Sequence, residues 1–147
     1  MKVETASADE LEAPLRLLET ELREGEPLPE EFAAALAKEV RSGFTEMLVV
    51  REPGSQEIAG VALVCYRLNL ASGGRFASFE ELHVAPECRN RGVGRALLAE
   101  VERRCYERGV SYVEAQIIEE SVDFFLSAGY EEEEDLRVLS RCIAFSD

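Results

Sequence analysis

Two glycines and three arginines fall within seven consecutive residues of this chain, immediately before a long amphipathic segment. Gly92 and Gly94 allow the main chain to turn tightly, with its N–H groups pointing outward at the start of a helix. Oriented amides and a helix N-terminus together form an anion site, and Arg89, Arg91 and Arg95 add full positive charges around it. The segment therefore predicts a site for a pyrophosphate group. The alternative is an ordinary glycine-containing loop with solvated arginines.

Two well-known nucleotide-binding motifs fit this loop less well. A Walker A loop ends in Gly-Lys-Ser/Thr, whereas the chain reads Gly94-Arg95-Ala96. A Rossmann fingerprint would place its third glycine at Leu97, where a bulky side chain disfavours close packing of helix on strand. Glu114 follows at about twenty residues, as a ribose-binding acid would, but the loop comes after several strands instead of opening the fold.

The segments around the loop predict a single α/β domain, residues 1–147, with a mixed central sheet of about six or seven strands and about four helices. Apolar residues at helical spacing predict the helices, over Ala8–Arg23, Pro29–Val40, Gly92–Arg108 and Ser121–Ala128. Runs typical of strands cover Val3–Thr5, Glu46–Arg51, Ile58–Leu68, Phe76–Val84, Tyr112–Ile118 and Val138–Phe145. These strands and helices would hold the loop at the end of a central strand.

The composition narrows the classes of function. The chain has 147 residues, of which 46% are hydrophobic, and this fits one compact core. The formal net charge of −14 repels phosphate backbones and anionic lipids, so we expect no nucleic-acid partner, no membrane partner and an affinity for cations. No stretch approaches the roughly 18 apolar residues of a membrane helix, and the first ten residues hold no apolar leader, so a cytoplasmic protein is expected.

The metal-ligating residue types are sparse. Four cysteines lie far apart without a C-x-x-C pair, and His83 is the single histidine. Zinc sites use cysteine and histidine at short spacing, so no metal site is expected and the thiols should be reduced.

The loop and its flanks carry a family resemblance. The motif is Arg89-Asn90-Arg91-Gly92-Val93-Gly94, with LHVAPE before it, ALL after it, and FFLSAGY further along. This combination resembles the GNAT superfamily of N-acetyltransferases, whose acyl-CoA motif is R/Q-x-x-G-x-G/A and whose later segment is F-Y-x-x-x-G-F. The resemblance covers most of the chain and is strongest from Phe76 to Tyr130.

The resemblance implies acetyl-CoA as co-substrate, wedged between two strands of a splayed mixed sheet. The backbone of Leu82, His83 and Val84 would hold the pantetheine arm and the acetyl carbonyl. The amides from Arg89 to Arg95 would hold the pyrophosphate, and Phe125 would lie near the thioester. Homodimers are common in the family, so a homodimer is one expectation.

An amine acceptor needs a carboxylate, because an alkylamine with a pKa near ~10 arrives as an unreactive cation at neutral pH. Glu80 and Glu81 precede the cofactor loop, and some small-amine and polyamine acetyltransferases of the family carry a similar acidic pair. Side chains alternate along a strand, so one of the two should face the substrate cleft. Glu114 on the next strand is a second candidate, resembling the glutamate of protein N-terminal acetyltransferases.

The expected function is transfer of an acetyl group from acetyl-CoA to a primary amine, either a small cationic amine or a peptide amine. One departure from the family affects this expectation, because Phe125 stands where a tyrosine usually protonates the departing thiolate. Tyr130, Tyr112, Ser121 or water could take that role. The alternative is a catalytically weak acyl-CoA-binding or interaction module of the same fold.

Overall fold

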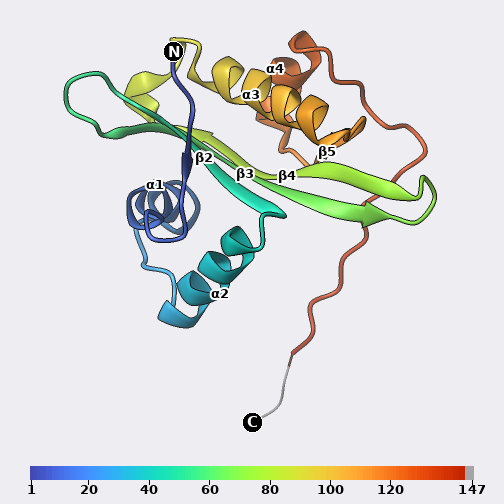
Figure 1. Ribbon diagram of the computed structural model, residues 1–147, viewed down its shortest axis with the longest axis horizontal. Coiled ribbons are helices and arrows are strands. Elements are labelled where there is room, and N and C mark those ends of the chain that lie inside the picture. Colours follow the sequence, from blue (N-terminus) through green and yellow to red (C-terminus); the bar gives the residue numbers. More distant parts are fainter. Residues whose placement is uncertain (145–147) are drawn as a thin grey trace. The chain divides into compact units, whose positions relative to one another are not determined.

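The computed structural model describes residues 1–144, which fall into two compact units, Met1–Gln116 and the chain from Ile117 onward (Figure 1). The first unit contains the sheet and most of the helices. The second contains one short helix and the C-terminal segment. Each unit is described by itself below.

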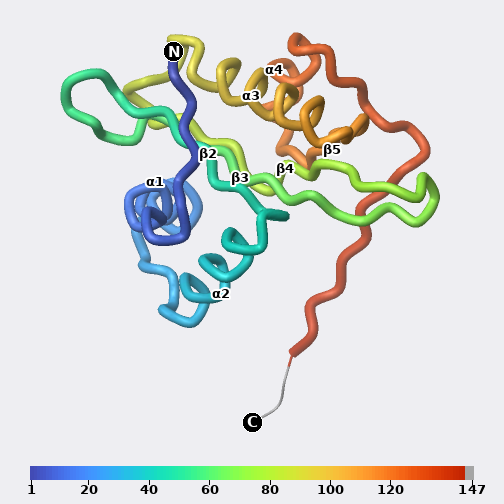
Figure 2. The backbone as a smooth tube through the Cα atoms, viewed as in Figure 1, coloured from blue at the N-terminus to red at the C-terminus, as the bar shows by residue number. Residues whose placement is uncertain are grey.

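The sheet of the first unit has five strands in the order β1-β2-β3-β4-β5. Their bounds are β1 Glu4–Ala6, β2 Thr45–Arg51, β3 Ile58–Asn69, β4 Gly74–Val84 and β5 Val113–Ala115. The first four pair antiparallel and β5 pairs parallel to β4, so the sheet is mixed, as expected. Figure 2 shows the chain running from β2 through β3 to β4 as one continuous meander. The expectation of six or seven strands is too high for residues 1–144, which form five.

Four helices are present in the described residues, as the apolar spacing predicts. They are α1 Glu12–Arg23, α2 Glu30–Arg41, α3 Val93–Arg108 and, in the second unit, α4 Val122–Ser127. In the first unit, α1 and α2 lie on one side of the sheet and α3 lies on the other (Figure 1). Among residues 1–144, none of the helices has the length and apolar content needed to cross a membrane.

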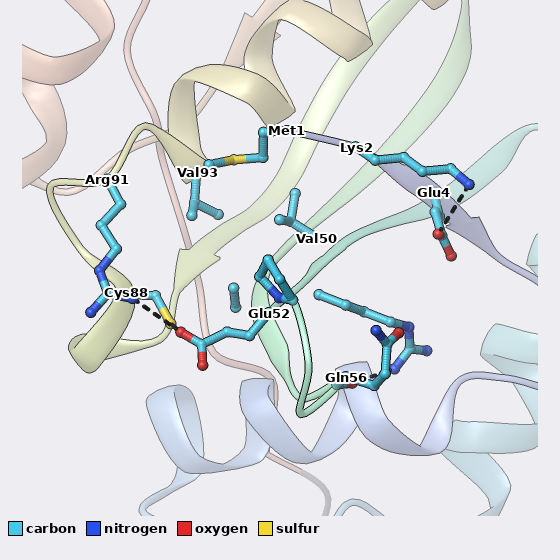
Figure 3. Close-up of a pocket in the computed structure, with 12 residues that line it drawn as sticks. Met1, Lys2, Glu4, Val50, Glu52, Gln56, Cys88, Arg91 and Val93 are labelled. Carbon is cyan, nitrogen blue, oxygen red and sulfur yellow. Dashed lines mark hydrogen bonds and ion pairs between the residues drawn. The ribbon is translucent and has the colours of Figure 1, made fainter.

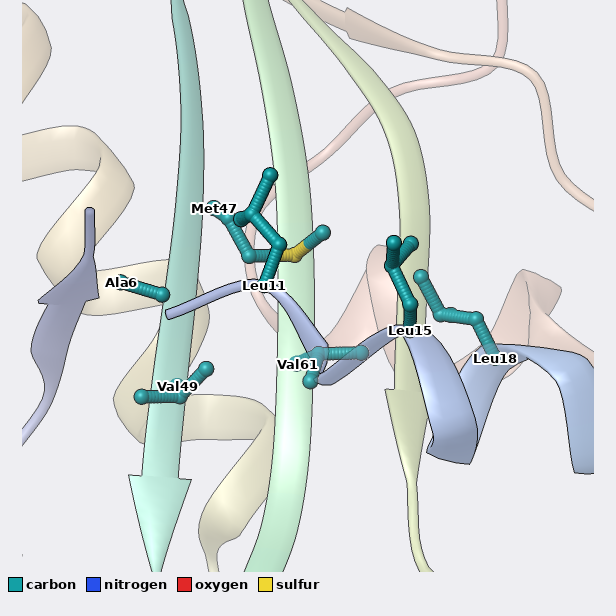
Figure 4. Packing of buried hydrophobic residues seen from close by; sticks show 7 residues of the cluster. All are labelled: Ala6, Leu11, Leu15, Leu18, Met47, Val49 and Val61. Carbon is teal, nitrogen blue, oxygen red and sulfur yellow. The ribbon is translucent and has the colours of Figure 1, made fainter. Parts of the chain in front are cut away.

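The core between α1 and the sheet is aliphatic. Leu15 and Leu18 of α1, with the N-cap residue Leu11, pack against strands β1, β2 and β3 (Figure 4). The buried cluster is Ala6, Leu11, Leu15, Leu18, Met47, Val49 and Val61. Full burial of a leucine side chain stabilises a fold by roughly 1.5–3 kcal/mol. The cluster also fixes which side chains of the sheet point toward α1, because residues at every second position of a strand share one face.

On the opposite face, α3 approaches β3 closely at a glycine. A Cβ atom at Gly60 would lie 2.5 Å from Cγ1 of Val93, the first residue of α3, and 3.3 Å from Cδ1 of Leu97. Gly60 therefore allows the N-terminal turn of α3 to rest directly on the sheet. This contact holds the start of the helix at the end of β4.

A charged network joins the far end of α3 to the same face. The Tyr66 hydroxyl donates to Glu46 Oε1 at 2.6 Å, and Arg104 Nη1 donates to Glu46 Oε2 at 2.6 Å. Arg108 lies 3.5 Å from the same carboxylate and stacks over the Tyr66 ring. Burial and the bond to Glu46 raise the pKa of Tyr66. We assign this network a structural role, because its charged side chains form ion pairs with one another.

Substitution of Glu46 should therefore destabilise the protein. We expect Glu46→Gln to lower the free energy of unfolding by about 2 kcal/mol, because hydrogen bonds to a charged, nearly buried group are lost. The side chain of Glu46 is 11% exposed. Glu107→Gln is a matched control, because Glu107 pairs with Arg103 at an exposed site and should change stability by less than about 0.5 kcal/mol. Equal denaturation midpoints for both variants would contradict this assignment.

The predicted strand Val138–Phe145 is wrong over its described part. Residues 138–144 form no strand and are exposed, and Phe145 lies outside the described residues. Alternating apolar side chains favour a strand only when another strand supplies the hydrogen-bonding partner, and no such pairing forms in residues 138–144. The predicted strand Tyr112–Ile118 is also too long, because the ladder includes only Val113–Ala115.

Candidate active site

Strand β4 contains a bulge at the predicted catalytic glutamates. Leu63 of β3 pairs with Glu81, whereas the next residue, Val64, pairs with Phe79. Glu80 is therefore left without a partner opposite it, which defines a β-bulge. Bulges redirect side chains and are common beside active sites.

The bulge places Glu80 and Glu81 on the same face of the sheet. Leu63 packs against the α1 core, so its cross-strand partner Glu81 points toward the α1 side. Glu80 forms an ion pair with Arg67, which lies two positions from Cys65 and four from Leu63 and so shares their face. The expectation that only one of the two acids faces that side is therefore wrong, because the bulge interrupts the alternation.

Glu81 is paired with the single histidine. Its Oε1 lies 2.9 Å from Nε2 of His83, two residues later on the same face. The side chains are 30% and 24% exposed, so both can be reached from solvent. This contact fixes the orientation of the imidazole. It uses one oxygen of the carboxylate, so Glu81 Oε2 takes no part in the pair with His83.

Glu114 joins these acids from the neighbouring strand. It pairs with Ser78 of β4, and Ser78 pairs with Cys65 of β3, so Glu114 also points to the α1 side. The structure thus brings all three predicted carboxylates, Glu80, Glu81 and Glu114, to one face over β4 and β5. From the sequence alone, the three residues are alternatives for one role.

The ladder between β4 and β5 is short. It ends at the pair Phe79 and Ala115. From residue 80 to residue 84, β4 has β3 on one side and no strand on the other within the described residues. The backbone of Leu82, His83 and Val84, expected to bind the pantetheine arm, lies in this unpaired stretch.

The loop after β4 makes an open helix N-terminus. A 3₁₀ turn, Pro86–Cys88, is followed by Asn90 at φ 64° and Gly92 at φ 84°, after which α3 begins at Val93. Gly92 is the N-cap residue and carries no side chain, so it cannot cap the first N–H groups of α3. Such amides suit an anion. Gly94 lies inside the first turn of α3, so the tight turn depends on Asn90 and Gly92 and not on Gly94.

Two of the loop arginines form ion pairs with acids from distant segments. Arg89 Nη2 lies 3.6 Å from Glu21 Oε2 of α1, and Arg91 Nη1 lies 3.2 Å from Glu52 Oε1 after β2. The sequence predicts that these arginines surround an anion. The structure adds a second role for them, which is to tie the loop to the rest of the first unit.

Glu52 connects the loop to the β2–β3 turn beside a pocket of about 490 Å³ (Figure 3). Its Oε1 accepts hydrogen bonds from Cys88 Sγ at 2.9 Å and from Arg91 Nη1 at 3.2 Å. Val93 and the segment around Lys2 also line this pocket. Glu52 therefore contacts the segment between β4 and α3 twice, at Cys88 in the 3₁₀ turn and at Arg91 shortly before α3.

The environment of Cys88 predicts an unreactive thiol. The hydrogen bond to Glu52, burial and the negative charge of Glu52 raise the pKa of Cys88 to about 11. At pH 8 only on the order of one thiol in a thousand would be ionised, and the thiolate is the reactive form. We expect iodoacetamide to modify exposed Cys142 rapidly and Cys88 very slowly, as followed by mass spectrometry. Glu52→Gln should accelerate the reaction of Cys88, because it removes the charge that favours the protonated thiol; an unchanged rate would contradict this cause.

Glu21 and Glu52 are the residues that sequence reasoning missed. Glu21 follows Leu18 by three positions on the apolar stripe of α1, so an acid on the core-facing side of a helix was the available signal. Nothing in the local pattern distinguishes Glu52, which follows a strand in an ordinary turn. Its role depends on a contact across 36 residues of sequence.

Phe125 belongs to α4 in the second unit. Its ring makes edge-to-face contacts with Phe124, at a centroid distance of 5.4 Å, and with Tyr130, at 5.1 Å. The N–H of Tyr130 donates to the Phe125 carbonyl at 3.1 Å. The FFLSAGY segment is thus a compact aromatic turn, and the position of Phe125 near a thioester stays a prediction.

Comparison with known families decides the class of the protein. A family model described as an acetyltransferase (GNAT) domain matches residues 17–145. The chain belongs to the GNAT acetyltransferase family. No curated protein sequence gives a significant match. The GNAT assignment makes the protein an acyltransferase.

Solved structures similar to this GNAT chain share its fold. An acetyltransferase from Trypanosoma brucei is 23% identical, with a TM-score of 0.80 over 95% of this chain and 99% of its own. An aminoglycoside acetyltransferase from an uncultured soil metagenomic sample, in complex with sisomicin, is 18% identical, with a TM-score of 0.82 over 97% and 96%. A transcriptional regulator from Bacillus halodurans is 20% identical, with a TM-score of 0.82 over 97% and 99%.

Proposed function

We propose that this GNAT protein transfers the acetyl group of acetyl-CoA to a primary amine of a small cationic acceptor. The observation that carries the proposal is the arrangement around β4. Three carboxylates share one face, the adjoining backbone edge is unpaired, and the strand leads into a helix N-terminus without a side-chain cap. This arrangement supports the proposal of an amine site at the carboxylates, a thioester site at the open edge and a pyrophosphate site at the start of α3.

The residues present fit acetyl-CoA. The first amides of α3 and the charges of Arg89 and Arg91 suit a pyrophosphate, and the open edge at Leu82–Val84 suits the amides of a pantetheine arm. When bound, acetyl-CoA supplies an already activated acyl carbon. The protein then needs no covalent nucleophile of its own.

The chain's own residues would manage the charge and the protons of the acceptor. The net charge of −14 attracts a cationic amine, and the carboxylates on the α1 side hold it at β4. Glu81, oriented by His83, accepts a proton from the ammonium directly or through water, so that the nitrogen lone pair can attack. The C–N bond forms as the C–S bond breaks and the coenzyme A sulfur leaves as a thiolate. The nitrogen then loses its second proton to that thiolate or to water, which leaves a neutral amide.

Phe125 supplies no proton to that leaving group. A free thiol has a pKa near ~8.5, so the thiolate is a tolerable leaving group near pH 7. A positioned general acid contributes roughly 10²–10⁴-fold in rate, and this GNAT protein is accordingly expected to be a slow enzyme unless Tyr130, Tyr112, Ser121 or water replaces the usual tyrosine.

A polycationic small molecule is the acceptor class that we favour over a peptide amine. The acidic composition supports this choice, and so does the structural similarity to an aminoglycoside acetyltransferase. A cytoplasmic location is part of the proposal, because all four cysteines, which lie in the described residues, are free thiols. The proposal also includes assembly as a homodimer. It includes neither a nucleic-acid partner nor a membrane partner.

A second candidate function is a weakly catalytic acyl-CoA-binding or interaction module. Phe125 favours it, since the hydroxyl usual in the family is missing at that position. The similarity to a protein named as a transcriptional regulator is consistent with it.

An acetylation assay on a panel of amines separates the two functions. The panel contains alkyl monoamines, diamines, an aminoglycoside and a short peptide, and release of coenzyme A reports turnover. We expect saturable acetylation of the cationic small molecules. Tight acetyl-CoA binding without acetylation of any amine would contradict the enzyme and favour the module.

A further inference from the structure

The single histidine of the chain lies beside the proposed base. His83 pairs across the sheet with Val61, which packs against α1, so its side chain lies on the same face as Glu81. Its Nε2 is 2.9 Å from Oε1 of Glu81, and the side chains of His83 and Glu81 are 24% and 30% exposed. The imidazole therefore contacts both the carboxylate and the solvent.

Within residues 1–144, Glu81 is the only charged side chain that forms an ion pair or a hydrogen bond with His83. The other charged residues on this face of β4, or on the elements that approach it, pair with one another or come from β5; they are Arg67 with Glu80, Arg89 with Glu21, and Glu114. In the same part of the chain, Nδ1 of His83 has no hydrogen-bond partner, so this nitrogen is available to water.

A carboxylate alone is a poor final acceptor for the proton of an alkylammonium. Ordinary pKa values are near ~10.4 for a lysine-type amine, ~6.5 for a histidine and ~4.3 for a glutamate. Proton transfer from the ammonium to a carboxylate is therefore unfavourable by roughly 10⁶-fold, and transfer to an imidazole by roughly 10⁴-fold. An imidazole thus holds the proton about 100-fold better, and its ordinary pKa lies near the working pH, where a general base is most effective.

We infer that His83 is the final acceptor of the ammonium proton and that Glu81 relays the proton to it. The inference rests on the proposed function and adds a second proton-carrying residue to it. Glu81 takes the proton from the ammonium nitrogen, directly or through water, and passes it across the contact between Oε1 and Nε2 to the neutral imidazole. The carboxylate is thereby restored beside an imidazolium cation. Loss of one proton from the ring to solvent returns His83 to its neutral form.

The opposing interpretation is that His83 only orients the carboxylate of Glu81. His83→Gln separates the two interpretations, because the N–H of a glutamine amide can still donate to Glu81 Oε1 but the amide cannot take up a proton. Glutamine would replace an orienting residue with little loss of activity. It would not replace a proton acceptor.

The test measures kcat with saturating acetyl-CoA and the amine that the wild type acetylates fastest, over roughly pH 5 to 10. We expect the wild type to show an inflection between roughly pH 5 and 8, the range in which histidine changes its charge. His83→Gln should lower kcat at pH 7 about 10–100-fold, lose that inflection and regain activity at high pH, where solvent deprotonates the amine. Its Tm and its affinity for acetyl-CoA should change little.

His83→Ala provides a second readout through chemical rescue. Imidazole and methyl-substituted imidazoles of different basicity are added to this variant, and the wild type with the same additions is the control. We expect the restored rate to rise with the basicity of the added imidazole, as for a general base, and the wild type to be unaffected.

The outcomes separate failure of the relay from failure of the proposed function. If His83→Gln retains kcat within about twofold of the wild type at pH 7, together with the inflection, the relay is refuted and the acetyltransferase function stands. A loss of activity in His83→Ala that none of the imidazoles restores would also refute the relay. If the wild type acetylates no amine, the proposed function fails and the relay fails with it.

Discussion

Replacement of Gly92 by valine is expected to weaken acetyl-CoA binding at least about 100-fold while the fold survives. Gly92 has φ 84°, a conformation that β-branched residues almost never adopt, although no atom would clash with an added Cβ. Forcing a side chain into that region costs roughly 1–3 kcal/mol, so the loop would change its conformation. The amides at the start of α3 would then point away from the pyrophosphate.

A glycine at the other end of the same helix provides the control. Gly109 ends α3 with φ 69° and has equally open surroundings, so Gly109→Val introduces comparable backbone strain far from the loop. Calorimetric titration with acetyl-CoA should show binding by Gly109→Val and none by Gly92→Val, with similar losses of Tm. If the two variants bound acetyl-CoA with equal affinity, the loop would not be part of the cofactor site.

Glu81→Gln is expected to lower kcat about 10²–10⁴-fold with little change in acetyl-CoA affinity. The amide cannot accept a proton from the ammonium, yet it preserves the size of the side chain and can still hydrogen-bond to His83. Turnover with a saturating amine, together with calorimetric titration of acetyl-CoA, separates chemistry from binding. A rate that recovers with rising pH in the variant would further indicate a lost base, because the solvent then deprotonates the amine.

Glu80→Gln and Glu114→Gln are the matched comparisons, since both acids lie on the same face. Glu80 is engaged by Arg67, so its substitution should disturb the bulge more than the proton transfer. We expect both variants to keep at least about a tenth of the wild-type turnover. Full activity of Glu81→Gln, with a large loss in either comparison variant, would move the base to that residue.

The parts of the fold that the sequence predicts are those fixed by local patterns. The apolar stripe of α3 and its last residue before Gly109 follow from helix periodicity and glycine, and the predicted start at Gly92 differs from the structure by one residue. The predicted end of β4 at Val84 agrees with the structure, since Pro86 favours termination of the strand. The loop that forms the open helix N-terminus could also be recognised, because its pattern of glycine and arginine is local in the sequence.

The parts that the sequence does not predict depend on partners far along the chain. The bulge at Glu80 follows from how β3 pairs with β4, and this register is not visible in either strand alone. Glu21 and Glu52 reach the loop from α1 and from the β2–β3 turn through tertiary contacts. Leu136, Val138 and Ile143 are residue types typical of strands, but they are exposed, and no strand in the described residues pairs with their segment.

A crystal structure with coenzyme A bound tests the central claim most directly. We predict that the diphosphate lies against the main-chain N–H groups between Gly92 and Arg95, and that the pantetheine arm follows the open edge of β4 at Leu82–Val84. A coenzyme A molecule bound elsewhere, with the start of α3 closed by the protein's own side chains, would contradict the account.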